Sequence, residues 1–286
     1  MNDQAETLRH LVNTNQKHTA KVVAIVSGKG GVGKSNVCLN FALALTEQKK
    51  KVAIIDLDIG MGNLDILMGL SAKRHIFDML KNQLTIWDII EKGPNDLTYL
   101  AGGSGLSEFV DLNEEELNRF SQQLESLGKE YDYIFLDMGA GATEESMQFI
   151  LAAHEVIVIT TPEPTAIMDA YAMVKYICLH DESKELALII NRAETEQEGI
   201  KTATNFTRVT SRFLNKELHI LGHLPDDRAV SRAVKAQIPF LLHNENTQVS
   251  KSIRFIVRHY LGQTKSPKET TFSSFIERMR NRFKKK

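Results

Sequence analysis

A glycine-rich segment near the start of the chain carries the residue types that bind phosphate, and it fits the pattern G-x-x-x-x-G-K-[ST]. Glycines let successive backbone N–H groups turn toward phosphate oxygens, a lysine neutralises the β and γ phosphates, and a hydroxyl ligates Mg²⁺. An apolar run precedes the segment and a helical pattern over residues 36–46 follows it, which is the context that such a loop requires. We therefore expect a nucleotide with Mg²⁺ to be held by Gly28, Lys29, Gly30, Gly31, Val32, Gly33, Lys34, Ser35 and Asn36.

The base of that nucleotide is indicated by a motif that the chain lacks. Guanine-specific proteins with this loop usually carry N-K-x-D after a later strand. The only Asn-Lys pair here, Asn215-Lys216, continues as Glu217-Leu218. The sequence therefore favours ATP, with ADP as product, over GTP.

Short apolar runs rich in Val and Ile recur along the chain, each followed by a longer helical pattern. They cover residues 22–26, 52–55, 133–136, 156–159, 186–190 and 218–224. Strands that are apolar on both sides belong to parallel sheets covered by helices on each face, and such sheets bind ligands at the carboxyl ends of their strands. We predict one α/β P-loop NTPase domain with a mostly parallel, twisted sheet and helices on both faces.

Composition excludes several classes of protein. The 286 residues are 42% hydrophobic and 25% charged, unlike disordered or collagen-like chains. The net charge of −1 argues against a general affinity for nucleic acid, so no specific nucleic-acid partner is expected. With two cysteines, a polar first twenty residues and no apolar stretch near the roughly 18–20 residues that span a bilayer, we expect a protein of the reducing cytoplasm.

The last fifteen residues differ in charge from the rest of the chain. Residues 272–286 hold six basic residues and one acidic residue, a net charge of +5. Their spacing predicts an amphipathic membrane-targeting helix with basic residues, including Arg278 and Arg282, near anionic lipid headgroups. The apolar side chains directed at the acyl chains would be Phe272, Phe275, Ile276, Met279 and Phe283. A terminal helix packed on the domain, or a solvated tail that binds RNA or DNA, has the same pattern.

Three boundaries follow from this reading. GQTKSPKETT, which ends at residue 271, contains Gly, Pro and almost no apolar residue, as linkers do. We therefore expect an N-terminal segment over residues 1–20, an ATPase domain over 21–262, a linker over 263–271 and the terminal helix over 272–286.

Two features make the phosphate loop more particular. Lys29 adds a second lysine near its start, and D-x-D-x-G follows the second apolar run at residues 56–60. KGGVGKS with this motif resembles the deviant Walker A ATPases of the MinD/ParA group. The resemblance covers residues 21–261 and continues through the segments GNLD, YIFLD, TTPEPT and INR. It implies a MinD-like ATPase.

The resemblance also implies roles for individual residues. Lys34 would hold the β and γ phosphates of its own ATP. Lys29 would act in catalysis as well, because it would reach the nucleotide of a second subunit and add positive charge where the leaving phosphoryl group is most negative, which would make a homodimer depend on ATP. Ser35 would ligate Mg²⁺ directly, and Asp137 through water. Asp58 would orient the attacking water, because an ordinary carboxylate is a weak base. Positions beside the base would be Asn191, Arg192, Pro225 and Asp226.

The first twenty residues carry a short apolar stripe. It is too short to form a stable helix by itself, so a frayed terminus is as good an interpretation as a functional peptide. The pattern D-Q-A-x-x-L-R at residues 3–9 resembles the activation peptide of the FlhG (YlxH) family of flagellar number regulators. That resemblance implies stimulation of the GTPase FlhF through Gln4, Leu8 and Arg9, with flagellar switch-complex (C-ring) proteins as further partners. It implies control of flagellar placement and number from the cytoplasmic face of the inner membrane.

Three alternatives stay open. A division-site regulator of the MinD type would share the ATPase and the tail without needing the N-terminal peptide. A ParA-type DNA-partitioning ATPase would hold DNA through basic residues of the helix after Asn191, namely Lys201, Arg208, Arg212 and Lys216. A scaffold would bind ATP without meaningful turnover.

Other metal or redox chemistry has little support in the sequence. His219 and His223 are four residues apart in a predicted strand and lack a third ligand. Iron-protein relatives of the MinD/ParA group bridge an iron–sulfur cluster with loop cysteines, whereas Cys38 and Cys178 fall in predicted helices. No cluster is expected.

Overall fold

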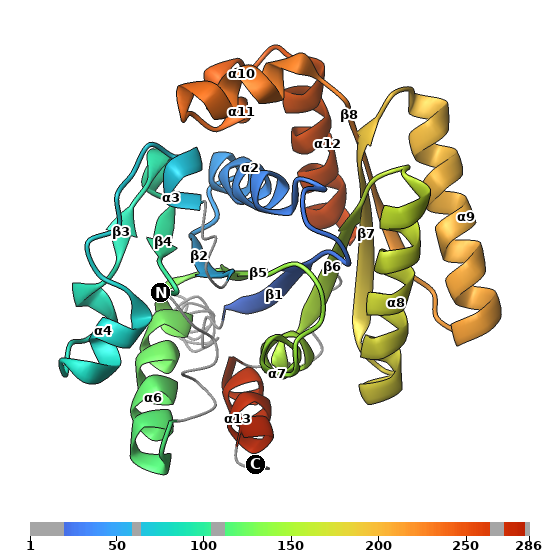
Figure 1. Cartoon of the computed structure of the whole chain (residues 1–286). Helices are drawn as coiled ribbons and strands as arrows, with labels where there is room; N and C mark the ends of the chain where they lie inside the picture. Colours follow the sequence, from blue (N-terminus) through green and yellow to red (C-terminus); the bar gives the residue numbers. More distant parts are fainter. Residues whose placement is uncertain (1–19, 59–63, 104–111, 264–271, 284–286) are drawn as a thin grey trace, which may run out of the picture.

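The computed structural model describes residues 20–58, 64–103, 112–263 and 272–283, and its elements carry the labels of Figure 1. A sheet of eight strands in the order β3-β4-β2-β5-β1-β6-β7-β8 forms the centre. The strands are β1 (Lys21–Val26), β2 (Val52–Leu57), β3 (Glu91–Lys92), β4 (Thr98–Leu100), β5 (Tyr133–Met138), β6 (Glu155–Thr160), β7 (Glu185–Ala193) and β8 (His219–Pro225).

All pairings are parallel except that of the edge strand β3 with β4. The six predicted strands are confirmed within a few residues. β3 and β4 were not predicted, because runs of two and three residues carry too little periodicity to be recognised.

Helices cover both faces of the sheet, as the sequence predicts (Figure 1). One face packs against α2 (Lys34–Glu47), α3 (Leu64–Leu67), α10 (Arg228–Ala236), α11 (Phe240–His243) and α12 (Gln248–Gln263). The other packs against α4 (Ile76–Lys81), α6 (Glu114–Glu130), α7 (Glu144–Ala152), α8 (Pro164–His180), α9 (Glu196–Leu214) and α13 (Phe272–Phe283). Two short 3-10 helices, η1 (Ile86–Asp88) and η2 (Pro94–Asp96), flank β3.

The starts of the helices differ in a way that matters for ligand binding. α6, α7 and α9 are capped by the side chains of Asn113, Thr143 and Thr195. α2 begins after Gly33 without a side-chain cap. Its first N–H groups therefore remain available to an anion, and the helix dipole favours one there.

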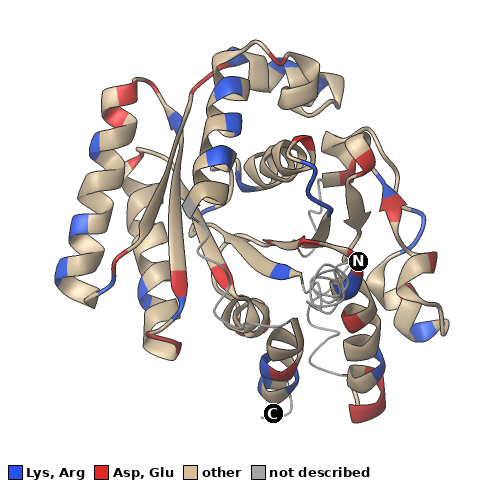
Figure 2. Cartoon of the chain, turned by 180° about the vertical axis from the view of Figure 1, so that it is seen from behind, with Lys and Arg blue, Asp and Glu red and all other residues tan. Residues whose placement is uncertain are grey.

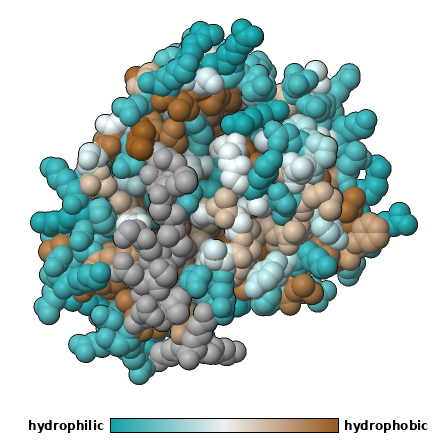
Figure 3. Space-filling model, viewed as in Figure 1, coloured by the Kyte–Doolittle hydropathy of each residue, from teal (hydrophilic) through white to brown (hydrophobic). Residues whose placement is uncertain are grey.

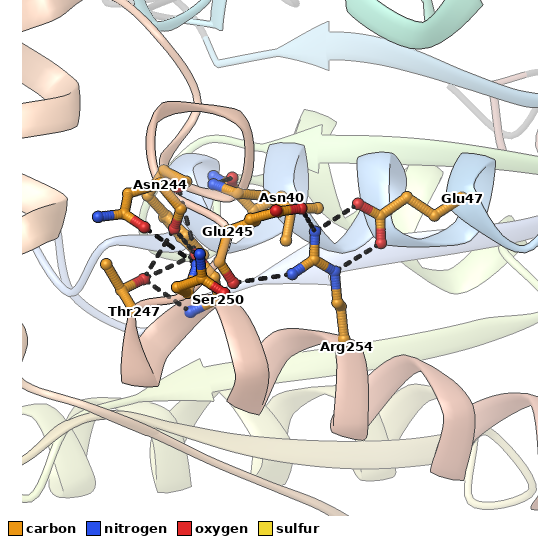
Figure 4. Close-up of polar contacts among 10 residues, drawn as sticks. Asn40, Glu47, Asn244, Glu245, Thr247, Ser250 and Arg254 are labelled. Carbon is orange, nitrogen blue, oxygen red and sulfur yellow. Dashed lines mark hydrogen bonds and ion pairs between the residues drawn. The ribbon is translucent and has the colours of Figure 1, made fainter.

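A polar cluster fixes α12 against α2, the helix that follows the phosphate loop (Figure 4). Arg254 donates from Nε and Nη2 to the two carboxylate oxygens of Glu47, at 2.7 and 2.8 Å. At the other end of the cluster, the buried Asn40 of α2 accepts the Leu241 N–H at 2.9 Å. Two-pronged arginine–carboxylate bonds fix orientation as well as distance, so α2 is held along its length.

The C-terminal helix α13 does not present its apolar face to solvent. Phe272, Phe275, Ile276 and Met279 are at most 4% exposed and lie in the core with α6 and α7, and Figure 1 shows α13 beside these two helices. Phe283, only partly buried, meets Phe149 edge to face. In this structure these side chains pack in the core, as in the packed terminal helix that the same pattern allowed. Their contact with lipid would require α13 to leave this position and stays a prediction.

Gly128 explains why α13 fits there. A Cβ at Gly128 of α6 would lie 2.4 Å from the ring of Phe272. The ring therefore occupies the space that a side chain at this position would need. Arg280 of α13 also donates to Asn118 of α6. Arg278 is exposed and Arg282 partly exposed, so the basic side of the helix stays near the surface.

Candidate active site

The phosphate loop lies at the carboxyl end of β1, at the centre of the sheet. Gly31 and Gly33 have φ values of 81° and 89°, which favour glycine. A Cβ at Gly33 would lie 2.5 Å from Nδ2 of Asn191. That amide nitrogen donates to the Val32 carbonyl at 2.8 Å. Asn191, at the end of β7, thus supports the loop directly.

Gly28 is required for a different reason. Its Cα lies against the backbone of α8, and a Cβ there would lie 2.1 Å from the carbonyl carbon of Asp169. Gly30, in contrast, would bring a Cβ no nearer than 3.8 Å to a neighbour. The start of the loop is therefore packed onto α8, and any side chain at Gly28 would force the two apart.

Lys34 points into the centre of the site. It is buried, and its Nζ lies 2.7 Å from Oδ1 of Asp137 and 3.9 Å from Oδ2 of Asp58. Burial opposes the charge of Lys34, but the carboxylates of Asp137 and Asp58 outweigh it and raise the pKa of the lysine. Lys34 is therefore a cation placed where β and γ phosphates would arrive.

Ser35 and Asp137 fit a hydrated Mg²⁺. The Ser35 hydroxyl accepts a hydrogen bond from Lys34 at 3.2 Å, which places it beside the same carboxylate. The second oxygen of Asp137, Oδ2, is buried and has no hydrogen-bond partner within the described part of the chain. An oxygen in that position needs a donor, and a water bound to Mg²⁺ supplies one.

Asp56 and Asp58 both turn toward this centre from the end of β2. Burial raises the pKa of Asp58, Lys34 lowers it, and Asp137 raises it further, with a net upward shift. Asp56 is 3% exposed and pairs across the sheet with Asp137. Burial first, and the Asp137 charge second, raise the pKa of Asp56 to about 7. Asp58 is the more accessible of the two, as its predicted role in orienting a water molecule requires, and that role stays a prediction.

Lys29 stands apart from this centre. Its side chain is 42% exposed, and its Nζ contacts Oε2 of Glu163 at 3.3 Å and Oγ1 of Thr165 at 3.1 Å. Both partners come from the loop and first turn that lead into α8. The lysine therefore lies at the rim of the site, beside its own α8.

A cavity of about 810 Å³ extends from the phosphate loop toward α10. Every position expected beside the base lines it, together with two residues of the loop and its helix: Gly33, Asn36, Asn191, Arg192, Pro225 and Asp226. Figure 3 shows apolar side chains gathered above it, over α10 and α11. The wall is partly apolar, as a planar base requires. The contact of these residues with a base stays a prediction.

Sequence reasoning missed the rest of this lining. Thr161, Glu163, Val230, Ser231, Phe240 and Val249 are among the other residues that line the wall. The Thr161 hydroxyl is buried without a hydrogen-bond partner among the described residues. The TTPEPT segment was a signal for Thr161 and Glu163, but α10 to α12 carry no motif, and only packing brings them here.

The remaining predicted residues lie elsewhere. Gln4, Leu8 and Arg9 fall outside the described residues. Lys201, Arg208 and Arg212 are exposed on α9, whose basic side is visible in Figure 2. Lys216, however, lies beyond the end of α9, which Asn215 closes in a left-handed conformation, and donates to the Glu182 carbonyl.

Cys38 lies in α2 and Cys178 in α8, as predicted. Across residues 20–58, 64–103, 112–263 and 272–283, no helix has the length and apolar character of a membrane span.

Comparison with known proteins agrees with this geometry. The model of a family described as AAA domain (AAA_31) matches residues 20–190, which hold the phosphate loop, Asp56, Asp58 and Asp137. The chain belongs to this family of P-loop ATPases. It is an ATP-hydrolysing enzyme, and its fold is that of MinD.

Individual relatives extend the match beyond that region. The P-loop ATPase is 34% identical to the antiactivator FleN of Pseudomonas aeruginosa, over 77% of this chain and 79% of FleN. It is 35% identical to the flagellum site-determining protein YlxH of Helicobacter pylori, over 82% of each chain. A solved MinC:MinD cell division complex from Aquifex aeolicus aligns with a TM-score of 0.69 and 25% identity, covering 87% of this chain and 99% of that one.

Proposed function

We propose that Lys34, Asp58, Ser35 and Asp137 form the catalytic centre for ATP hydrolysis. Lys34 neutralises the β and γ phosphates, and Asp58 orients the attacking water, a task of position more than of basicity. Ser35 and Asp137 hold Mg²⁺, which neutralises phosphate charge when bound. The 2.7 Å pairing of Lys34 with Asp137 and the unpartnered Asp137 oxygen support this arrangement.

ATP binding joins two copies of the chain in this proposal. The observation that carries it is the position of Lys29, which is 42% exposed at the rim of the site while Lys34 occupies the centre. A lysine at the rim can reach a nucleotide held by another subunit, and its charge favours one that is negative. Glu163 and Thr165 hold it until that nucleotide arrives.

The ATP-bound pair regulates flagellar placement and number. The relatives FleN, an antiactivator, and YlxH, a flagellum site-determining protein, support this function over that of a division-site regulator. The N-terminal peptide would stimulate the GTPase FlhF through Gln4, Leu8 and Arg9, and switch-complex proteins would be further partners. Stimulation of FlhF that is lost with Gln4→Ala separates this function from the division-site alternative.

Membrane attachment requires α13 to leave its position against α6 and α7. Each fully buried apolar side chain contributes about 1.5–3 kcal/mol, and the acyl boundary of a bilayer offers an equally apolar environment. The docked helix and the lipid-bound helix are therefore close competitors. Basic residues such as Arg278 then meet anionic headgroups, and two helices on one dimer bind far more tightly than one.

The test uses Asp58→Ala. We expect this variant to bind ATP, to hydrolyse it at least tenfold more slowly than the wild type, and to form dimers with ATP but not with ADP in size-exclusion chromatography with light scattering. The same samples are sedimented with anionic liposomes. Wild-type turnover in the variant would refute the role of Asp58, and a monomer at saturating ATP would refute the dimer.

A further inference from the structure

Asp56, buried behind Asp58, has both carboxylate oxygens engaged. Oδ1 accepts the backbone N–H of Asp58 at 3.0 Å, and Oδ2 accepts the hydroxyl of Tyr99 at 3.3 Å. The first bond closes a turn of the kind that an aspartate makes with the N–H two residues on. It fixes the direction in which the chain leaves β2, and with it the position of the Asp58 carboxylate.

Tyr99 reaches Asp56 from the neighbouring strand. β4 pairs with β2 so that Tyr99 lies opposite Ile54, two residues before Asp56. Its ring is 2% exposed, and burial together with the Asp56 carboxylate raises the pKa of Tyr99, so its hydroxyl keeps the proton that it donates. Beyond β4, Gly102 packs on the Asp56 backbone, where a Cβ would lie 2.0 Å from the Asp56 carbonyl oxygen.

Asp56 lies beside a charge of the same sign. It lies opposite Asp137 in the sheet, and Asp137 binds Lys34 at 2.7 Å. Asp137 raises the pKa of Asp56 more than Lys34 lowers it, so repulsion outweighs attraction, and an Asp56 carboxylate without the Tyr99 donor would be pushed away from Asp137. That movement would open the Asp58 turn.

We propose that Tyr99 is a positioning residue for ATP hydrolysis, which holds Asp56 so that Asp56 can hold Asp58 at the attacking water. This inference rests on the proposed role of Asp58. Tyr99 is 2% exposed and bonds to Asp56, so it would act through the two aspartates.

The test is steady-state ATP hydrolysis by Tyr99→Phe, which keeps the ring and removes only the hydroxyl. We expect kcat to fall roughly 5–10-fold while KM for ATP changes less than about twofold, because loss of one hydrogen bond misplaces the water and leaves phosphate binding intact. A purely structural role would lower stability and leave kcat unchanged.

The chain offers a matched control. Tyr260 is also 2% exposed and donates to a buried carboxylate, Glu155, at 2.8 Å, but that pair lies at the amino ends of the strands. Tyr260→Phe should lower the unfolding midpoint and leave kcat unchanged. Equal kcat in both variants and the wild type would overturn the proposal, and so would a rise in KM without a fall in kcat.

Two further variants locate the effect. Asp56→Ala should lower kcat at least as much as Tyr99→Phe, and the double variant should be no slower than Asp56→Ala, because the two residues act in series. Asp56→Asn keeps an oxygen for the Asp58 N–H and should be faster than Asp56→Ala. If the losses of kcat in the two single variants add up in the double variant, Tyr99 does not act through Asp56 and the proposal is overturned. If Asp58→Ala itself turns over normally, the proposed catalytic centre fails, and that result is read before any Tyr99 variant.

Discussion

Asp56 shows at the scale of a single residue how a site for phosphate strains the fold that contains it. Its pKa rises from 3.8 to about 7 through burial and through the neighbouring Asp137 charge. Below pH 3.8 the group is neutral in both folded and unfolded chains. Between pH 3.8 and 7 the folded chain holds a proton that the unfolded chain releases, so the contribution of Asp56 to stability falls as pH rises. Above pH 7 its destabilising effect is complete.

Replacement of Asp56 by Asn should therefore stabilise the nucleotide-free protein more at pH 8 than at pH 5. The folded and unfolded proteins differ in the protonation of Asp56 between pH 3.8 and about 7, and roughly two pH units of that range lie above pH 5, so the advantage of Asp56→Asn should grow by about 2–3 kcal/mol. Urea unfolding of both proteins at the two pH values measures it. A constant difference would mean that Asp56 is ionised throughout this range.

The element whose placement carries most consequence is α13. Its basic, amphipathic sequence suits lipid, and its docked position on α6 and α7 hides the face that lipid would need. Gly128 is the point where this docking can be changed without altering α13 itself, because the ring of Phe272 occupies the space of the missing side chain.

We predict that Gly128→Leu displaces α13 and makes membrane binding independent of ATP. The added side chain would occupy the space of the Phe272 ring, and overpacking of this kind costs about 1–3 kcal/mol. Cosedimentation with anionic liposomes, without nucleotide, should rise several-fold above the wild type. The control is Gln122→Leu, an equal apolar addition at an exposed position of α6. Binding that equals the control would show that docking is not what keeps the helix from lipid.

At the scale of the whole molecule, the two lysines of the loop differ in burial as the proposed dimer requires. Lys34 is 6% exposed and belongs to its own site, whereas Lys29 is exposed and supports little of its own fold. Surface ion pairs such as that of Lys29 with Glu163 contribute only about 0–1 kcal/mol. Loss of Lys29 should therefore leave the monomer intact.

Lys29→Ala, placed in the Asp58→Ala background, should keep the unfolding midpoint and ATP binding and lose the ATP-dependent dimer. Light scattering at saturating ATP measures the mass, and Lys201→Ala on the exposed side of α9 is the matched loss of a surface lysine. That control should still pair. A dimer that persists without Lys29 would place the contact between subunits on other residues.

Residue types and their spacing are enough to predict the chemistry at the centre and the order of the strands and helices. Gly28 to Ser35 lie together in the chain, so the loop could be recognised from types and spacing, and the apolar runs reported a parallel sheet because strands buried on both sides have a local signature. Once those two facts hold, the carboxyl ends of β1, β2 and β5 bring Lys34, Asp58 and Asp137 together.

Which helix and strand surfaces pack against each other is seen in the tertiary structure alone. The pattern of residues 272–286 fits lipid and protein equally, and the choice depends on a space at Gly128 that lies more than 140 residues away in the chain. The hydrogen bond from Tyr99 to Asp56 and the cavity wall formed by α10 to α12 likewise depend on how segments that are distant in the chain pack together. The periodicity of a segment shows which of its faces is apolar. Whether that face fits the face of another segment depends on the shapes of both, so neither sequence segment predicts it by itself.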